Sequence, residues 1–228
     1  MLAEHQITHV VHLAALQVPS VRENPVLGSR VNVTGTVNVF EAAKRLGLRT
    51  PIAYASSAAV YDRDGNVAPS TLYGVFKLAN EGAAAIYAAD HGVASVGLRP
   101  FTVYGPGRDQ GMTAGPTLAI AAAVRGEPYR IAFGGATQLH YAFDVAGAFI
   151  QAARSAPVGS LTYCIGGPAT SMADFVALLG DVVPGAEISY DETVLPFPDQ
   201  LPKPWFDSPS TPLETGVRET AVMLRSIV

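Results

Sequence analysis

Short apolar runs alternate with longer amphipathic segments over the first hundred residues. The runs "HVVHLAA", "PIAYASS" and "ASVGLR" have the length and composition of buried parallel strands. The longer segments carry apolar side chains at helical spacing, and each ends before a glycine that can stop a helix. Strands that alternate with helices in this way predict a parallel α/β sheet. The expected elements are a strand at 7–15, a helix at 26–46, a strand at 51–57, a helix at 72–91 and a strand at 94–99.

The pattern loosens after residue 100, where a loop rich in glycine and proline is expected over residues 100–115. A loop as long as 100–115 is usually functional when it interrupts a compact domain. Two later helices are expected to begin with capping boxes, one formed by Ser171 and Asp174 and the other by Thr211 and Glu214. The other expected elements are a helix near 116–125, strands at 129–133 and 139–143, a helix at 144–156 and a strand at 160–167.

Composition narrows the class of protein. Of the 228 residues, 49% are hydrophobic and 15% charged, which indicates a globular chain rather than a disordered one. A net charge of -4 without any basic run does not indicate nucleic-acid binding. No apolar run approaches the ~20 residues needed to cross a bilayer, and the N-terminus has no signal-peptide pattern. The single cysteine, Cys164, excludes an intramolecular disulfide and fits a reducing compartment. We expect a cytoplasmic protein without membrane or nucleic-acid partners.

Three polar residues suggest a reaction that uses general acid–base catalysis. Tyr73 and Lys77 are four residues apart, so they lie on one face of the expected helix. A neighbouring ammonium stabilises a phenolate and lowers the tyrosine pKa, which makes Tyr73 a candidate general base. Ser57 ends a strand, where open α/β sheets bind their ligands, and its hydroxyl can orient a substrate oxygen. The alternative is an ordinary solvated Tyr/Lys pair on a helix surface.

A series of motifs favours the catalytic interpretation of Tyr73 and Lys77 over an ordinary solvated pair. "HVVHLAA", "RVNVTGTVNVFEAAKRLG", "YASSAAVY", "YGVFK" and "GLRPFTVYGPGR" together resemble the extended short-chain dehydrogenase/reductase family of NAD-dependent sugar epimerases and dehydratases. The resemblance covers nearly the whole chain and implies one domain, 1–228. Its fold would be an N-terminally truncated, Rossmann-like parallel sheet flanked by helices, with a small C-terminal substrate lobe. The Rossmann part would comprise about 1–99 and 144–166, and the lobe about 100–143 and 167–212.

The resemblance also implies roles for individual residues. Ser57, Tyr73 and Lys77 match the catalytic triad, and Tyr73 and Lys77 would also contact the cofactor. The cofactor would be NAD or NADP, with NAD favoured. Asn32 matches a helix asparagine that supports the active site. The remaining cofactor contacts would come from Leu13, Ala14 and Ala15 in a backbone turn, and from Pro100 and Phe101 beside the nicotinamide ribose and ring.

The chain departs from the family at its beginning. Its first strand corresponds to the family's fourth, so the glycine-rich turn that holds the pyrophosphate is missing by comparison. We expect a truncated gene or a miscalled start rather than a relative that works without cofactor. The chain as written is then expected to bind NAD weakly and to self-associate through the apolar edge of its first strand.

Two substitutions bear on the substrate. Family members that act on nucleotide sugars commonly carry asparagine where this chain has Thr102, and a diphosphate-binding arginine where it has Thr137. Losing that arginine removes a bidentate phosphate partner. We therefore expect a sugar, a sugar acid or a similar small molecule rather than a nucleotide sugar. The candidate substrate contacts are Gln17, Ser57, Thr102 and His140.

Other interpretations remain open at this stage. Whether the enzyme would be an epimerase, a dehydratase or a dehydrogenase does not follow from the motifs. The alternative class is a degenerate, non-catalytic binding or regulatory relative. A homodimer could form through the helices at about 26–46 and 72–91. No metal site is expected, because His12 lies within a strand and has no second ligand at useful spacing.

Overall fold

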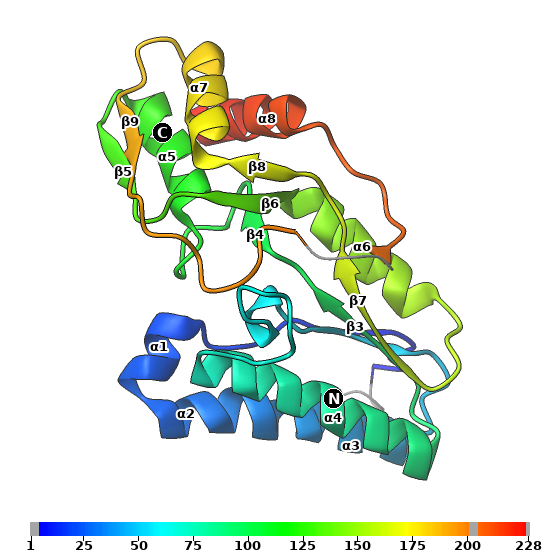
Figure 1. Ribbon diagram of the computed structural model, residues 1–228. Coiled ribbons are helices and arrows are strands. Elements are labelled where there is room, and N and C mark those ends of the chain that lie inside the picture. The colour runs from blue at the N-terminus through cyan, green and yellow to red at the C-terminus, as the bar shows by residue number, and fades with distance from the viewer. Residues whose placement is uncertain (1–4, 201–204, 227–228) are drawn as a thin grey trace.

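A twisted parallel sheet forms the centre of the protein (Figure 1). The computed structural model describes residues 5–200 and 205–226. All four strand pairings in the sheet are parallel, and the order is β1-β2-β3-β7-β10. The parallel sheet expected from the alternating pattern and the Rossmann-like fold implied by the family resemblance are therefore confirmed. The strands are β1 (Val10–His12), β2 (Ile52–Ala55), β3 (Ser95–Arg99), β7 (Ser160–Ile165) and β10 (Trp205–Phe206).

Helices cover both faces of this sheet because both faces are apolar. Helices α3 (Gly35–Leu46) and α4 (Leu72–His91) pack side by side on one face, and α6 (Ala142–Arg154) packs on the other (Figure 1). Successive side chains of a strand point to opposite faces. Ile52 and Tyr54 accordingly join the core formed with α3 and α4, whereas Ala53 joins the core formed with α6.

The segment expected as one helix at 26–46 contains an irregular turn. It begins as α2 (Pro25–Ser29), widens into a π-helical turn η1 (Arg30–Thr34) and continues as α3. A further short helix, α1 (Val18–Glu23), precedes it and was not expected from the sequence. Single π turns inside α-helices are often found at functional sites, and this one carries Asn32.

A smaller lobe lies beyond the carboxyl ends of the central strands (Figure 1). It has its own core, in which Ile120, Phe175 and Val217 come from three different helices. Its strands form a β4-β6-β8 sheet and a β5-β9 pair. The elements are β4 (Thr102–Tyr104), α5 (Gly115–Arg125), β5 (Tyr129–Ile131), β6 (Ala136–Tyr141), β8 (Ala169–Ser171), α7 (Met172–Val182), β9 (Ile188–Tyr190) and α8 (Leu213–Arg225).

Four local features differ from the sequence-based expectation. The glycine- and proline-rich loop contains strand β4, and the segment before α8 contributes β10 to the central sheet. Helix α8 packs against α5 and α7 and so belongs to the lobe. The capping box at Thr211 is wrong, because Pro212 occupies the cap position and Thr211 instead donates two hydrogen bonds to Asp144. Ser171 caps α7 as expected.

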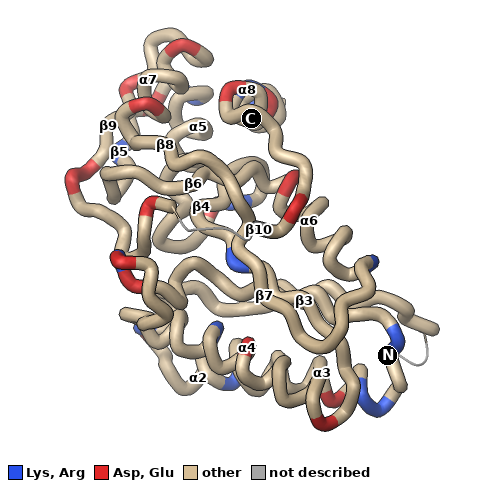
Figure 2. Tube along the Cα trace, turned by 45° about the vertical axis from the view of Figure 1, so that its right-hand side comes forward, with Lys and Arg blue, Asp and Glu red and all other residues tan. Residues whose placement is uncertain are grey.

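Charged residues are dispersed over both parts of the molecule. Basic and acidic residues occur both around the central sheet and in the lobe (Figure 2). Between Arg154 and Lys203 all charged residues are acidic. Among the described residues, no helix has the length and apolar character needed to cross a membrane.

Candidate active site

A cavity of about 220 Å³ opens where the central sheet meets the lobe. It lies at the carboxyl ends of β2 and β3, which is where open α/β sheets place their ligands. The sequence-predicted residues Ser57, Tyr73 and Lys77 all line it. Five other predicted contacts line it as well: Leu13, Ala15, Gln17, Pro100 and Phe101.

Helix α4 brings Tyr73 and Lys77 to the cavity because its first turn is fixed in place. Thr71 caps the helix by accepting a hydrogen bond from the Gly74 backbone at 3.1 Å. Gly74 allows the helix to approach the 3-10 turn η2 (Ala58–Val60), since a Cβ at this position would overlap the carbonyl oxygen of Ala59. The first two turns of α4 therefore present one polar face to the end of β2.

Lys77 is a buried cation, with only 3% of its surface exposed. Its Nζ donates a hydrogen bond of 2.6 Å to the carbonyl oxygen of Ala55 and lies 5.5 Å from the centre of the Tyr73 ring. Burial lowers the pKa of Lys77 to about 8. An ammonium so placed keeps donors available for a ligand in the cavity, because the carbonyl of Ala55 occupies only one of its three N–H groups.

Tyr73 is also buried, and burial raises the pKa of its phenol. A hydrogen bond with Ser57 and the positive charge of Arg108 act in the opposite direction. The sequence predicts that Lys77 lowers this pKa, but the net shift is upward. Removal from water outweighs the nearby charges, and the Lys77 ammonium is directed at Ala55 rather than at the phenol oxygen.

The end of β2 supplies the two adjacent serines. Ser57 is extended and caps the turn η2 by accepting a hydrogen bond from the Ala59 backbone at 3.1 Å. Ser56 also lines the cavity, and its hydroxyl donates to the carboxylate of Glu81 on α4. The hydrogen bond of Ser56 therefore joins the end of β2 to helix α4, and the hydrogen bond of Ser57 fixes the turn η2 that follows.

Asn32 supports the cavity from outside its wall. Its Oδ1 accepts from the backbone N–H of Leu16 at 2.7 Å, and its Nδ2 donates to the Leu16 carbonyl at 2.9 Å. The carbonyl of Asn32, in the π turn, accepts from Thr36 and Asn80. This arrangement fixes the chain just after the turn that holds Leu13 and Ala15.

Two predicted substrate contacts lie elsewhere. Thr102 is fully buried, and its Oγ1 lies 3.1 Å from Oγ1 of Thr137 on β6. His140 is 6% exposed and sits behind Phe101, with ring centres 6.3 Å apart; burial lowers its pKa to about 4. Neither side chain lines the cavity. Thr102 pairs with Leu139 and His140 pairs with Val103, so the two side chains lie on opposite faces of the lobe sheet. Ala14 also lies outside the cavity lining.

The cavity contains residues that the sequence did not single out. Arg108, Met112 and Thr113 come from the loop after β4, and Phe197 comes from the segment after β9. Nη2 of Arg108 donates to the Thr113 hydroxyl at 3.0 Å, and the guanidinium is close enough to Tyr73 for its charge to lower the pKa of the phenol. The loop could be recognised as substrate-facing from its glycines and prolines, but not which of its residues would face the cavity. No metal-binding group of His, Cys, Asp and Glu occurs among the described residues.

Comparisons with known proteins find similar sequences. The sequence profile of the NAD dependent epimerase/dehydratase family matches residues 1–166. UDP-glucuronate 4-epimerase 5 of Arabidopsis thaliana is 38% identical over 109 residues, which cover 43% of this chain and 25% of that protein. UDP-glucose 4-epimerase of Mycolicibacterium smegmatis is 30% identical over 171 residues, 70% of this chain and 55% of that one.

The fold is similar to solved structures over almost its whole length. A structure of MoeE5 in complex with UDP-glucuronic acid and NAD matches with a TM-score of 0.82 and 28% identity, covering 98% of this chain and 81% of that chain. A partial consensus L-threonine 3-dehydrogenase matches with a TM-score of 0.85 and 26% identity, covering 99% and 82%.

Proposed function

The chain belongs to the NAD dependent epimerase/dehydratase family, and we propose that it oxidises a hydroxyl group of a carbohydrate-like acid with NAD. The observation that carries this proposal is the convergence of Ser57, Tyr73, Lys77 and Arg108 on one cavity. Three of these groups serve the hydroxyl-to-carbonyl conversion, and the fourth is a cation suited to an acidic substrate.

The cavity suits the nicotinamide end of a dinucleotide. Leu13, Pro100 and Phe101 give it apolar walls, against which a planar ring can pack. The unused N–H donors of Lys77 are available for ribose hydroxyls. NAD, when bound, supplies the acceptor for the hydride that leaves the substrate carbon.

The protein's own residues handle the proton. Ser57 holds the substrate hydroxyl, and Tyr73 as phenolate removes its proton while the carbon becomes a carbonyl. Lys77 stabilises the phenolate once a ligand has displaced water from the cavity. Return of hydride and proton to the opposite face would make the reaction an epimerisation, whereas loss of the carbonyl product would make it a dehydrogenation.

Arg108 supports an acidic substrate. Its guanidinium is partly buried, lines the same cavity as Tyr73, and makes no ion pair among the described residues. A carboxylate next to the reacting hydroxyl would match the planar fork of this side chain. The relatives named for UDP-glucuronate are in keeping with a sugar acid.

We further propose that the substrate is not a nucleotide sugar. The position expected to carry a phosphate-binding arginine is Thr137, which is 1% exposed and bonded to Thr102. Neither hydroxyl is directed into the cavity, so neither can hold a diphosphate there. Several relatives are named for UDP-sugars, so the substrate panel must include both classes.

The experiment is turnover of sugar acids, neutral sugars and the corresponding UDP-sugars at high NAD concentration, followed as NADH formation for a dehydrogenation and as the epimeric product for an epimerisation. Tyr73→Phe should lower kcat by about 10²- to 10⁴-fold, the usual range for a lost general base. Tyr87→Phe on the same helix is the matched control, since Tyr87 bonds to Glu41 away from the cavity. Near-full turnover by Tyr73→Phe would overturn the assignment of the base.

Arg108→Met tests the substrate class separately. It should raise KM for acidic substrates by about 10- to 100-fold, the value of one charge-assisted hydrogen bond, and leave neutral sugars unaffected. Arg125→Met is a suitable control, because Arg125 pairs with Glu127 on the surface. Equal changes in KM for acidic and neutral sugars would show that Arg108 does not bind the carboxylate of the substrate.

A further inference from the structure

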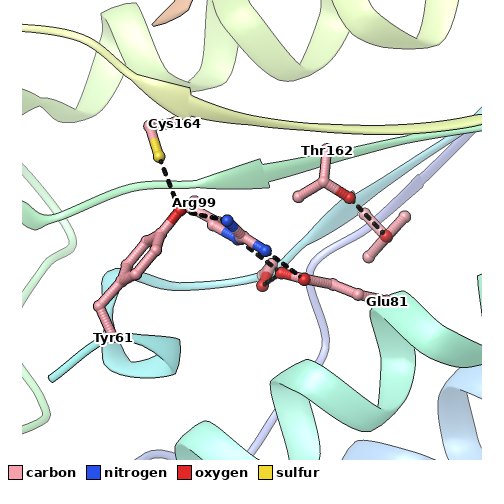
Figure 3. Close-up of polar contacts among 7 residues, drawn as sticks. Tyr61, Glu81, Arg99, Thr162 and Cys164 are labelled. Carbon is pink, nitrogen blue, oxygen red and sulfur yellow. Dashed lines mark hydrogen bonds and ion pairs between the residues drawn. The ribbon is translucent and has the colours of Figure 1, made fainter. Parts of the chain in front are cut away.

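Glu81 stands one helical turn after Lys77 on α4, which is where a carboxylate most readily pairs with a lysine. That pair does not form. Instead, Glu81 binds Arg99, the last residue of β3: Nε of Arg99 donates to Oε1 at 2.7 Å and Nη2 donates to Oε2 (Figure 3). Ser56 donates to the same Oε1. Both carboxylate oxygens are therefore occupied by partners other than the lysine.

This ion pair is removed from water. The side chains of Arg99 and Glu81 are 14% and 9% exposed. The guanidinium also donates to the Tyr61 hydroxyl and lies over the Tyr61 ring, 4.9 Å from its centre (Figure 3). The Tyr61 hydroxyl in turn contacts the Cys164 sulfur on β7. Arg99 is thus held by several elements and cannot readily leave Glu81.

We propose that Arg99 is a positioning residue that neutralises Glu81 and so keeps the Lys77 ammonium free for the cavity. Without Arg99, a buried carboxylate one turn away would draw Lys77 out of its hydrogen bond with Ala55. With Arg99 in place, the lysine faces the end of β2 and the ligand. This inference rests on the proposed function, in which Lys77 serves the cofactor and Tyr73.

Charged and titratable groups from four parts of the chain lie near Lys77, whose own pKa is lowered by burial. Tyr73 and Glu81 lie on its own helix, and Arg99 ends β3. His12 on β1 is close enough for Lys77 to lower its pKa, in addition to the effect of burial. Arg108 lines the same cavity. Of these groups, Glu81 and Arg99 form the pair whose charges cancel, so removing either one should shift the pKa of Lys77 in a distinct direction.

The test is an NMR titration of the lysine side chains in the full chain, with ¹³C at Cε. The sequence has three lysines, Lys44, Lys77 and Lys203, and Lys77→Met assigns the signal of interest. Arg99→Met should raise the pKa of Lys77 by about one pH unit or more, because an uncompensated carboxylate favours the charged form. Glu81→Gln should lower it, because it leaves the Arg99 cation uncompensated.

The double variant Glu81→Gln/Arg99→Met removes both charges and should return the pKa of Lys77 close to the wild-type value. Arg99→Lys keeps the charge and should also stay close to wild type. The Lys44 signal is an internal control, since Lys44 pairs with Glu41 on the surface.

An unchanged Lys77 pKa in folded Arg99→Met or in Glu81→Gln would overturn the proposal and leave the pair a purely structural contact. If Arg99→Met does not fold, Glu81→Gln and the double variant decide by the same criterion. Because the titration needs no turnover, its outcome is independent of the proposed reaction. The predicted loss of activity in Tyr73→Phe and the predicted shift of the Lys77 pKa are independent results, and either one can be absent when the other is observed.

Discussion

The side-chain amide of Asn32 forms two hydrogen bonds with the backbone of Leu16, accepting from its N–H at 2.7 Å and donating to its carbonyl at 2.9 Å. This pairing imitates a rung of a β-ladder between a π-helical turn and the segment that follows β1. It explains why a helix otherwise continuous from Pro25 to Leu46 widens at this point. The widened turn places the side-chain amide of Asn32 next to the backbone N–H and carbonyl of Leu16, beside the cavity.

Asn32→Asp tests this pairing most directly. The substitution preserves shape but replaces the donor toward the Leu16 carbonyl by a negatively charged oxygen. The buried acceptor left unpaired should lower the free energy of unfolding by about 1–3 kcal/mol. The measurement is urea denaturation followed by circular dichroism. Asn38→Asp, at an exposed position on α3, is the control and should stay within about 0.5 kcal/mol of wild type. Equal small effects at both positions would contradict the role of Asn32.

Lys77→Met should stabilise the protein near neutral pH while it removes activity. The pKa of Lys77 is lowered from 10.5 to about 8 on folding, so between these values the unfolded chain binds more protons than the folded one. Stability from this group therefore rises with pH across that window, and the full penalty of the buried charge is present below pH 8. Allowing for the lost hydrogen bond to Ala55, the gain at pH 7 should be about 2 kcal/mol.

The measurement is the thermal midpoint of wild type and Lys77→Met from pH 6 to pH 10.5. The difference should be largest at pH 6–8 and should shrink toward the upper end of the range. Lys44→Met, which loses an exposed ion pair with Glu41, should show no such trend. A difference independent of pH would mean that the lysine is not buried as a cation.

The Thr102–Thr137 contact predicts strong non-additivity. Either single Thr→Val replacement leaves one buried hydroxyl without its partner and should cost about 1–2 kcal/mol. The double variant replaces both hydroxyls by methyl groups of the same shape and should lie close to wild type. Urea denaturation of the four proteins gives the cycle. KM for any substrate should be the same in all four, since neither side chain lines the cavity; a raised KM in the singles would restore Thr102 as a substrate contact.

Local signals determined most of what could be predicted about the fold. The helix expected at 72–91 has those bounds in the structure, because Thr71 caps its start and Gly92 is left-handed at its end. Strands β2 and β3 were recognised from continuous apolar runs between such signals. Strands β4 and β10 were not, since they have three and two residues and owe their pairing to neighbours distant in sequence.

The site residues likewise fall into those that local sequence features locate and those that tertiary packing places. Ser57, Tyr73 and Lys77 could be located because a strand end and a helical spacing of four are local properties. Which way Thr102 and His140 face depends on how β4 and β6 pack in the lobe, and this is not encoded in their immediate neighbours. Arg108 reaches the cavity only because its loop folds back over the sheet. The upward pKa shift of Tyr73 likewise follows from burial, a tertiary property.

The exposed edge of strand β1 predicts self-association of the 228-residue chain. Among the described residues β1 pairs with β2 alone, and Ile7, Val11 and Leu13 on this edge are 40%, 42% and 52% exposed. An apolar strand with one free edge is a template for pairing with a second copy. We expect light scattering of the 228-residue chain to show a mass that grows with concentration.

A charge on this edge should reduce that growth, because lysine on an edge strand opposes further pairing. Val11→Lys is the variant, and Ile86→Lys on α4, where Ile86 is 60% exposed, is its counterpart on the helical face. If the edge drives association, Val11→Lys lowers the mass and Ile86→Lys leaves it unchanged. The reverse result would place the contact on α3 and α4 and support the homodimer that the sequence suggests. Because one variant alters a strand edge and the other a helix surface, the pair separates association through β1 from association through the helical face.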